Sequence, residues 1–451
     1  MKSMSLHEIA AACGGTYYGT EEAAALEVSG VAIDSRLIEE GYLFIPIKGA
    51  RVDGHTFIPQ VMSKGALCTL SEHPIDDASF PYILVNSCEQ AMKAIAEHYR
   101  KALGVKVVGI TGSVGKTSTK EMVASILEQK YNVLKTAGNF NNEIGLPLTI
   151  FRIREEHDVA VLEMGISDFE EMHRLAKMAR PDICIITNIG LCHLENLGDR
   201  DGVLKAKTEM FDYASENAIC VLNGDDDKLI TVKELNGKAP QFFGLSTEHN
   251  AYADHIHSLS LKGTTCTLHL WDNTIDTLIP IPGKHMVYNA LAGALVGREL
   301  GLTCEEIKAG IEALTPVSGR NNLIATEDLC IIDDCYNANP ISTMASIDVL
   351  ATADTRKVAI LGDMFELGED EKQLHYSVGK YAADKGIDLV ICIGALSKNT
   401  CEGASGIHFD TKANFFAVAD KLLQKGDTVL VKASNGMKFP EIVEQLQTLH
   451  F

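Results

Sequence analysis

The chain contains 451 residues, a length that favours about three domains. Hydrophobic residues make up 46% of the chain, which is enough to bury substantial cores. The 40 lysines and arginines against 61 aspartates and glutamates give a formal charge of 40 − 61 = −21, which argues against nucleic acid or an anionic membrane as the main partner.

The cysteines and the first residues indicate the compartment. The 12 cysteines form no C-x-x-C pair, and Cys184 and Cys220 lie in apolar runs, as buried thiols do. This usage is typical of a reducing compartment. Residues 1–12 lack the apolar core of a signal peptide, and Ser5 and Glu8 predict a capping box at a helix start. We expect a cytoplasmic protein without a membrane-inserted segment, since no apolar run is long enough to cross a bilayer.

Short strands and helices alternate in the first hundred residues. Residues 29–33 and 43–47 are predicted strands, and residues 91–103 are a predicted helix that leads into a new unit. We therefore expect a small α/β N-terminal domain over residues 1–103.

The most informative stretch is G-I-T-G-S-V-G-K-T at residues 109–117. An apolar strand at 105–108 precedes it, and a helical pattern at 118–129 follows it. A glycine-rich loop between a strand and a helix directs backbone N–H groups and a helix N-terminus at one point, which favours phosphate. The alternative is an ordinary glycine-rich turn. The predicted nucleotide-binding residues of the loop are Thr111, Gly112, Ser113, Val114, Gly115, Lys116 and Thr117.

Beyond the loop the chain alternates between strands and helices. Residues 159–163, 183–187 and 218–222 are short apolar runs typical of parallel strands buried on both faces. Residues 257–281 have the alternating character of an antiparallel extension. We expect a central P-loop mononucleotide-binding domain over residues 104–315.

A third unit follows. Residues 329–332, 358–361, 389–393 and 428–431 are predicted strands separated by helical stretches, a doubly wound α/β pattern. This pattern predicts a C-terminal Rossmann-like domain over residues 316–451. Three domains around one nucleotide site favour a substrate cleft between domains.

Several polar residues at element ends are open to two interpretations. Glu163 ends a predicted strand beside the loop, where a carboxylate can bind Mg²⁺ or simply be solvated. His193 follows the next strand, and Lys205 and Lys207 lie on a predicted helix; alone, each is more typical of a structural or solvated side chain.

The C-terminal half offers further candidates of the same kind. His285 and Asn289 lie one turn apart on a small-residue helix, and Arg320 would suit a phosphoryl group or be a surface charge. The polar runs 333–340 and 361–368 each follow a strand, where they form a site or an Asx-rich turn.

Taken together, these segments resemble the Mur ligase family over essentially the whole length. The resemblance rests on T-G-S-V-G-K-T at 111–117, T-A-G-N-F-N-N-E-I-G-L-P at 136–147, D-D-C-Y-N-A-N at 333–339 and G-D-M-F-E-L-G at 362–368. Several motifs in the right order are far more specific than any one of them. The block at 136–147 is similar to that of the member which adds a dipeptide.

The resemblance implies an ATP-dependent, amide-forming ligase of peptidoglycan synthesis. ATP would phosphorylate the free carboxylate of a UDP-N-acetylmuramoyl-tripeptide, and the amine of D-alanyl-D-alanine would attack the acyl phosphate. A carboxylate that approaches a polyphosphate meets repulsion of roughly 4 kcal/mol per charge pair at about 4 Å, so Mg²⁺ and fixed cations must offset it. We expect a monomer.

The resemblance also implies roles residue by residue. Thr117 and Glu163 match ligands of a first Mg²⁺, and His193 matches a residue at a second. Lys207 lies fourteen positions after His193, where the family has a carbamylated lysine that serves the metal site. Lys116 and Arg320 would stabilise the transferring phosphoryl group.

The remaining implied roles concern nucleoside and substrate. His285 and Asn289 would lie on the nucleotide side, Asp334 would contact the ribose, and Tyr336 would lie on the adenosine side. The implied substrate-binding residues are Ser35, Arg36, Asn139, Asn141, Asn142, Asp363 and Glu366. Asn435 departs from the basic residue expected at its position.

Two other functions remain open. Another ligase of this superfamily would add a single amino acid to a muramoyl-peptide or to folate; the 136–147 block disfavours it. A nucleotide-dependent switch without ligase activity is the second, and the set Thr117, Glu163, His193 and Lys207 argues against a degenerate site.

Overall fold

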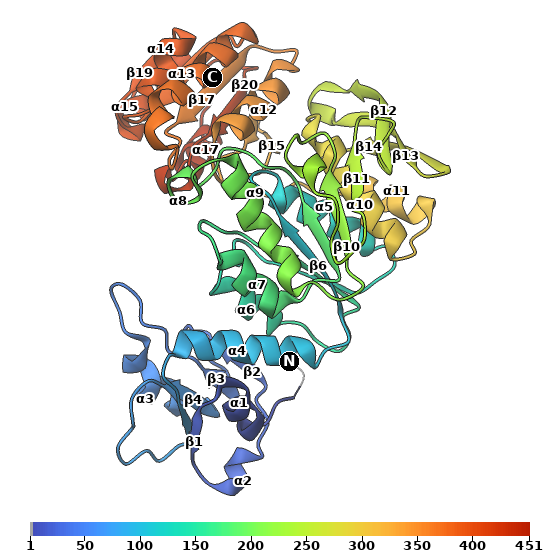
Figure 1. Ribbon diagram of the computed structural model, residues 1–451. Coiled ribbons are helices and arrows are strands. Elements are labelled where there is room, and N and C mark those ends of the chain that lie inside the picture. The colour runs from blue at the N-terminus through green and yellow to red at the C-terminus, as the bar shows by residue number, and fades with distance from the viewer. Residues whose placement is uncertain (1–2) are drawn as a thin grey trace.

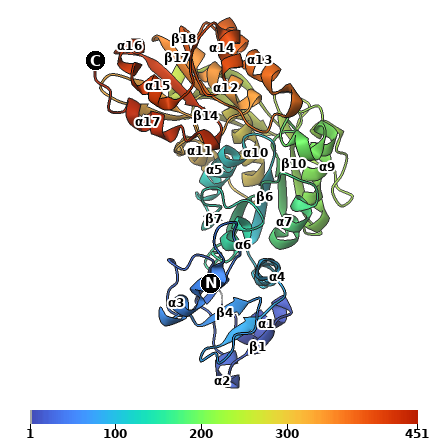
Figure 2. The same ribbon diagram turned by 90° about the vertical axis from the view of Figure 1, so that its left-hand side faces the viewer.

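The computed structural model describes residues 3–451 and divides the chain among three β-sheets, each with its own helices (Figure 1). The two views agree that the N-terminal domain lies at one end of the molecule, the C-terminal domain at the other, and the central domain between them (Figure 2). The expected α/β class with three domains is confirmed.

The N-terminal domain contains a five-stranded sheet in the order β1-β5-β4-β3-β2, in which only β1 is antiparallel to its neighbour. Ser5 and Glu8 form the expected capping box at the start of α1. The elements are β1 (Thr16–Tyr18), β2 (Gly30–Ala32), β3 (Tyr42–Phe44), β4 (Cys68–Ser71), β5 (Tyr82–Leu84), α1 (Leu6–Cys13), α2 (Glu21–Ala24), α3 (Ile58–Ser63) and α4 (Cys88–Lys101).

The central domain contains a nine-stranded sheet in the order β14-β13-β12-β11-β10-β9-β6-β8-β7. Strands β6 to β12 are all parallel, and β13 and β14 form the expected antiparallel extension. The strands are β6 (Lys106–Thr111), β7 (Val133–Lys135), β8 (Val159–Glu163), β9 (Ile183–Ile186), β10 (Ile219–Asn223), β11 (Gln241–Gly244), β12 (Ala251–Ser258), β13 (Thr264–Leu270) and β14 (Asn273–Ile279). The helices are α5 (Lys116–Leu127), α6 (Gly145–Ile150), α7 (Glu171–Ala179), α8 (Leu194–Leu197), α9 (Arg200–Thr208), α10 (His285–Glu299) and α11 (Cys304–Glu312).

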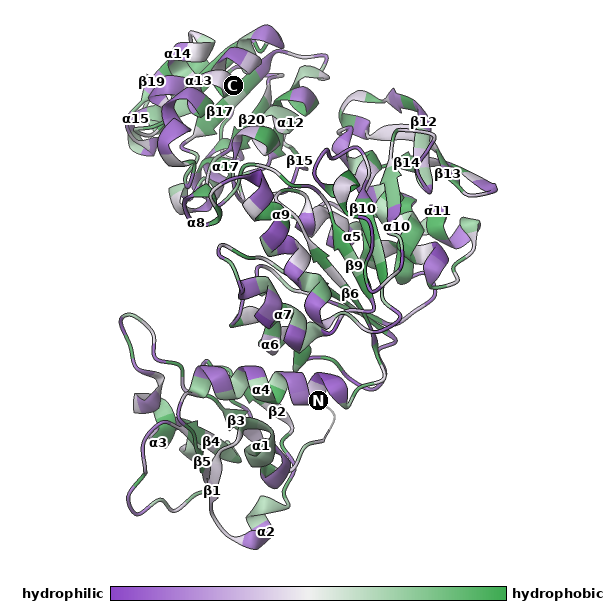
Figure 3. Cartoon of the chain, viewed as in Figure 1, coloured by the Kyte–Doolittle hydropathy of each residue, from purple (hydrophilic) through white to green (hydrophobic). Residues whose placement is uncertain are grey.

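Side chains of the central parallel strands alternate between two hydrophobic cores. Along β8, Ala160 and Leu162 enter one core, whereas Val159 and Val161 enter the other. The second core is closed by α5, α10 and α11. This alternation explains why these strands are apolar throughout, since both faces of the sheet are covered (Figure 3).

The C-terminal domain contains a six-stranded sheet in the order β15-β16-β20-β17-β18-β19, parallel except for β15. The strands are β15 (Asn322–Ala325), β16 (Cys330–Asp333), β17 (Lys357–Gly362), β18 (Leu389–Ile393), β19 (Ile407–Phe409) and β20 (Thr428–Lys432). The helices are α12 (Pro340–Ala351), α13 (Glu371–Asp384), α14 (Lys398–Ala404), α15 (Lys412–Phe416), α16 (Ala419–Leu422) and α17 (Pro440–Leu446). Short 3-10 turns occur at Gly54–Phe57, Glu209–Tyr213, Leu229–Thr231, Ser260–Lys262, Gly368–Asp370 and Asn435–Met437.

The domains meet in two different ways. Helix α4 lies between the N-terminal sheet and helices α6 and α7, and one continuous core contains residues of both domains (Figure 1). The cores of the C-terminal domain are instead separate from those of the central domain; of the described central residues, only Leu261 packs against them.

Element boundaries differ slightly from the prediction. Strands at 159–163 and 389–393 agree with β8 and β18, but α4 begins at Cys88 rather than at residue 91 because Ser87 Oγ caps it by accepting from the Gln90 N–H. No helix in residues 3–451 has both the length and the apolar character that crossing a membrane requires.

Candidate functional site

The glycine-rich loop turns sharply between β6 and α5. Gly112 has φ +148° and Gly115 has φ +86°, and a Cβ on Gly112 would overlap Thr187 Oγ1. The loop is stabilised by Asn188, whose side chain accepts from Val114 N and donates to Val114 O at 2.9 Å each. Thr111 ends the strand below the loop, with its carbonyl accepting from Thr187 N at 3.0 Å. The result is a rigid cradle in which the first turn of α5 offers free backbone donors.

Lys116 folds back over this loop. Its Nζ donates to Gly112 O at 2.8 Å, and burial lowers its pKa. Among residues 3–451 it forms no ion pair with a carboxylate. An unpaired cation at a helix N-terminus makes the loop a strong anion site.

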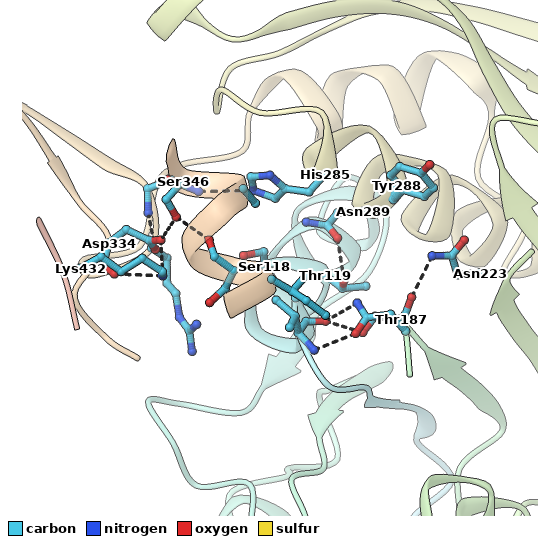
Figure 4. A pocket seen from close by; sticks show the side chains of 18 of the residues that line it. Ser118, Thr119, Thr187, Asn223, His285, Tyr288, Asn289, Asp334, Ser346 and Lys432 are labelled. Atoms are coloured by element: carbon cyan, nitrogen blue, oxygen red, sulfur yellow. Dashed lines mark hydrogen bonds and ion pairs between the residues drawn. The ribbon is translucent and has the colours of Figure 1, made fainter. Parts of the chain in front are cut away.

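A cavity of about 190 Å³ lies beside the loop, between the central and C-terminal domains (Figure 4). Its central side includes Asn223, His285, Tyr288 and Asn289, and its C-terminal side includes the residues Asp334, Ser342, Ser346 and Lys432. Asn289 Oδ1 accepts from Thr119 Oγ1 at 2.9 Å, and burial lowers the pKa of His285. A cleft with convergent polar groups at a domain boundary suits a nucleoside.

A second cavity of about 300 Å³ adjoins the first, and Val114, Gly115, Arg320 and Ser342 line both. The second cavity contains the phosphate end of the loop. Its lining also includes Ser113, Lys116, Thr117, Asn141, Asn142, Glu163, His193 and Tyr336. Most residues of the predicted phosphate and metal site therefore line one space, but Lys207 is not among the residues that line it.

Glu163 is suited to a divalent cation. It is 2% exposed; its Oε1 accepts from Asn141 Nδ2 at 2.9 Å, and its Oε2 has no hydrogen-bond partner among the described residues. A buried, unpartnered carboxylate oxygen is costly unless a ligand satisfies it. Because no three His, Cys, Asp or Glu residues cluster in the described chain, such an ion would also need the Thr117 hydroxyl, phosphate and water. Mg²⁺ accepts such a mixed set, so the residues fit it.

His193 lines the same cavity and connects the two domains through Glu366. Its backbone has φ +52°, its Nδ1 lies 3.1 Å from a carboxylate oxygen of Glu366, and burial lowers its pKa although Glu366 opposes this. Glu366 is itself at φ +62° and lines a neighbouring cavity with Lys116.

Lys207 on α9 is 1% exposed. No carboxylate forms an ion pair with it within residues 3–451, and burial, with a smaller contribution from Lys116, lowers its pKa to about 8. An ammonium group buried beside a second ammonium is unfavourable, so this lysine is poised to lose its positive charge.

Arg320 lies in the segment between the central and C-terminal domains. Its guanidinium donates to Thr117 Oγ1 at 3.3 Å and lies 4.0 Å from the centre of the Tyr336 ring. Its Nε is buried without a hydrogen-bond partner among the described atoms. The guanidinium can thus accept an anion between the two cavities.

Other predicted residues have protein partners. Asp334 accepts from Asn321 N at 3.2 Å and forms an ion pair with Lys432. Tyr336, expected on the adenosine side, lines the phosphate-side cavity and not the nucleoside-side one. Asp363 is buried and accepts from Ser397 N at 2.7 Å, outside both cavities.

The substrate-side predictions are spread over two domains. Asn142 Oδ1 accepts from the N–H of Gly145, the first residue of α6, at 2.8 Å, and Asn139 is exposed outside both cavities. In the N-terminal domain, Ser35 and Arg36 lie on a loop after β2, and Arg36 pairs with Asp34 at 2.6 Å.

Four residues that line the first cavity are not among the sequence-based predictions: Asn188, Asn223, Tyr288 and Lys432. Asn188 and Lys432 stand at or just beyond the ends of apolar strands, which is a usable signal for a site in a parallel sheet. Tyr288 lies on a helix whose small residues indicate tight packing, so no local signal distinguishes it from a residue that only packs.

Sequence models of three family domains match the chain in order. They are described as "Mur ligase family, catalytic domain" at residues 27–110, "Mur ligase middle domain" at 110–297 and "Mur ligase, glutamate ligase domain" at 319–435. The chain is 38% identical to the UDP-N-acetylmuramoyl-tripeptide–D-alanyl-D-alanine ligase of Bacillus subtilis (strain 168), with 93% of each chain covered. It is 36% identical to the enzyme of that name from Escherichia coli (strain K12), with 99% of each covered.

Solved structures agree with these matches. A crystal structure of MurF from Acinetobacter baumannii superimposes with a TM-score of 0.93 at 29% identity, with 100% of both chains covered. A MurF ligase from Thermotoga maritima in complex with ADP superimposes with a TM-score of 0.84 at 29% identity, over 93% of this chain and 97% of the other. This chain belongs to the Mur ligase family.

Proposed function

We propose that the chain is an ATP-dependent ligase that joins D-alanyl-D-alanine to UDP-N-acetylmuramoyl-tripeptide through an acyl phosphate. The relatives of that name match nearly the whole chain, and the domains that they share with it include the candidate site. The MurF structures that superimpose over 93–100% of the chain support the same assignment.

One observation supports it above the others: unpaired cations and an unsatisfied buried carboxylate oxygen surround a single cavity. Lys116 and Arg320 are free to bind transferring phosphate, and Glu163 Oε2 is free to bind Mg²⁺. Thr117 and Glu163 would hold a first ion, and His193 would serve a second. Bound Mg²⁺ would neutralise charge on the polyphosphate.

The reaction requires two bond exchanges in this cavity. A carboxylate oxygen of the tripeptide attacks the γ-phosphorus, and ADP leaves. The free amine of the dipeptide then attacks the acyl carbon, and its nitrogen loses one proton as the amide forms. Inorganic phosphate leaves with the electron pair of the broken C–O bond and takes up that proton. Lys116 and Arg320 stabilise the charge that peaks on the transferring phosphoryl group.

Lys207 is proposed to act as a carbamate. Its neutral amine would attack CO₂ and lose a proton, which replaces a buried cation with an anionic oxygen ligand. With a pKa of about 8, roughly a quarter of the molecules would carry the neutral amine at pH 7.5, so the reaction is accessible. Lys207 is buried and has no ion-pair partner among residues 3–451, which supports this proposal.

Nucleoside and substrate residues are assigned as follows. His285 and Asn289 would lie on the nucleotide side, and Asp334 near the ribose. Ser35 and Arg36 would receive the uridine diphosphate, and the substrate peptide would lie along Asn139, Asn141 and Asn142. Asp363 and Glu366 would lie on the dipeptide side; of these two, Glu366 is exposed beside the cavities.

The deciding experiment measures phosphate release and product mass with Mg-ATP, UDP-N-acetylmuramoyl-tripeptide and D-alanyl-D-alanine. We expect phosphate only when all three are present, and a product whose mass equals tripeptide plus dipeptide minus water. Glu163→Gln, nearly identical in shape, should abolish both signals. Release with a single amino acid and none with the dipeptide would overturn the assignment in favour of another ligase.

The tripeptide's third residue can be varied in the same assay. Hydrolysis of ATP without any carboxylate substrate would instead support a nucleotide switch.

Because one chain contributes both sides of both cavities, we propose that it acts as a monomer, to be tested by sedimentation. Since ATP and UDP-linked precursors are cytoplasmic, we propose that the reaction takes place there.

A further inference from the structure

Arg320 is a long, flexible side chain at the centre of the site, and its orientation has a visible cause. The segment that carries it is bonded to the motif after β16: Asp333 Oδ2 accepts from Gly319 N at 2.7 Å, and Gly319 O accepts from Tyr336 N at 3.2 Å. Gly319 has φ +75°, which lets this turn approach the Tyr336 backbone. Since Asn321 N also donates to Asp334 Oδ1, hydrogen bonds to the C-terminal domain hold the backbone on both sides of Arg320.

The side chain of Arg320 is fixed by the Tyr336 ring. The guanidinium carbon lies 4.0 Å from the ring centre, while the far end reaches Thr117 Oγ1 in the central domain. No carboxylate of the described chain forms an ion pair with Arg320, and its buried Nε has no hydrogen-bond partner there. The aromatic face is thus the contact that sets the plane of the guanidinium while leaving its donors for an anion.

Tyr336 is correspondingly unsuited to stacking on a base. It lines the cavity that contains Lys116 and Glu163, not the one that contains His285 and Asn289. One face of its ring is already occupied by the guanidinium, and Asn435 Nδ2 donates to its carbonyl at 3.1 Å. No hydrogen bond to its hydroxyl oxygen occurs within residues 3–451, so the hydroxyl has no part in this arrangement.

We propose that Tyr336 is a positioning residue for the transferred phosphoryl group: its ring orients Arg320 so that the guanidinium faces the γ-phosphoryl group when the carboxylate attacks. The inference rests on the proposed ligase function. An oriented guanidinium interacts more strongly with the negative charge of the phosphoryl group in the transition state than in bound ATP. Loss of this orientation should therefore lower kcat and leave the KM for ATP almost unchanged.

The test compares three substitutions in the full chain. Tyr336→Leu should lower kcat about tenfold with less than a threefold change in the KM for ATP, because a cation–π contact of this kind is removed. Tyr336→Phe keeps the ring and should retain at least half of the wild-type kcat. Tyr336→His keeps a smaller flat ring, should give an intermediate kcat, and preserves the test if the leucine variant folds poorly.

A matched control is Tyr381→Leu. Lys385 Nζ lies 5.0 Å from the Tyr381 ring on α13, away from both cavities, so this substitution removes a second cation–π ring of the same domain. We expect unchanged kcat. In an Arg320→Lys background, Tyr336→Leu should cost less than twofold, since the planar group that the ring orients is gone.

Each outcome is decisive. A raised KM for ATP with normal kcat in Tyr336→Leu would mean that the ring binds nucleotide, and an equal loss in Tyr336→Phe would mean that the hydroxyl acts; both overturn the inference. Undiminished loss in the Arg320→Lys background overturns it as well. The NMR order parameter of the Arg320 side-chain Nε–H bond should be high in the wild type, where the ring holds the guanidinium, and lower in Tyr336→Leu. An inactive wild type would refute the proposed function instead.

Discussion

The two joints of this molecule are built differently. The N-terminal and central domains share one hydrophobic core, with Tyr99 Oη donating to Ile153 O at 2.6 Å and Glu143 pairing with both Lys93 and Arg174. The central and C-terminal domains meet through polar contacts, and of the central residues in the described chain only Leu261 packs against a C-terminal core.

This difference indicates which pair of domains can be separated at the lower cost in free energy. Separating the first joint would expose apolar surface, which costs roughly 25 cal/mol per Å². Separating the second would break contacts such as His193–Glu366, Arg320–Thr117 and the hydrogen bond from Ser260 Oγ to Thr352 O. Both cavities lie at the second joint, so we expect the C-terminal domain to open and close around substrates more readily than the N-terminal domain moves.

The largest expected effect separates activity from stability inside the central domain. Lys207→Met should lower kcat by about 10³-fold, because it removes the proposed carbamate ligand. The free energy of unfolding at pH 7 should be equal or higher, since a buried ammonium without an ion-pair partner is removed. Turnover and urea denaturation measure the two quantities, and wild-type turnover would eliminate the carbamate.

The carbamate should also form in a pH-dependent way. At constant dissolved CO₂, the pKa of about 8 means that the neutral amine of Lys207, and with it the rate of carbamate formation, increases about tenfold per pH unit below 8 and levels off above. The appearance of a carbamate signal from ¹³C-labelled CO₂ measures this rate by NMR. A rate that still increases tenfold per unit between pH 9 and 10 would indicate an ordinary lysine.

The rigid joint is tested by Tyr99→Phe. Removing the hydroxyl takes a donor from the buried carbonyl of Ile153, so the free energy of unfolding should fall by about 1–2 kcal/mol. The kcat of the folded fraction should not change, because Tyr99 lies in the shared core and outside the described cavities. A loss of kcat without a loss of stability would contradict the division between the two joints.

The smallest effect is expected for Glu366→Gln at the polar joint. The ion pair with His193 involves a carboxylate that is 67% exposed, so its loss should alter stability by less than about 0.5 kcal/mol. Small-angle X-ray scattering without nucleotide should nevertheless show a larger radius of gyration. Glu369→Gln, three residues away and also exposed, is the control and should scatter like the wild type.

How much the sequence predicts depends on how local the cause is. The strand β8 and the glycine-rich loop follow from neighbouring residues, since strand, loop and helix are consecutive in the chain. The sequence also places Glu163 at the end of β8, but it leaves open whether this carboxylate binds a metal or is solvated. The stacking of Tyr336 on Arg320 joins residues sixteen positions apart across the hairpin of β15 and β16, and no local pattern distinguishes it from a base-stacking aromatic.

Long-range partners explain the remaining gaps. Asp334 stays a predicted ribose ligand, and the sequence does not show that its carboxylate forms an ion pair with Lys432 from a strand almost a hundred residues later. Asp363 stays a predicted site residue, and the sequence does not show that its side chain accepts from the backbone of Ser397. The order of the strands in the C-terminal sheet brings these residues together. Nothing local in the sequence predicts that order; only the family resemblance does.

The ligase reaction through an acyl phosphate is tested most directly by an isotope experiment. The tripeptide substrate is prepared with both oxygens of its reacting carboxylate as ¹⁸O and is incubated with the chain, Mg-ATP and D-alanyl-D-alanine. The proposed reaction predicts one ¹⁸O atom in each released phosphate and one in the new amide. Unlabelled phosphate would mean that water, not the carboxylate, attacks the γ-phosphorus, and would contradict the proposed reaction.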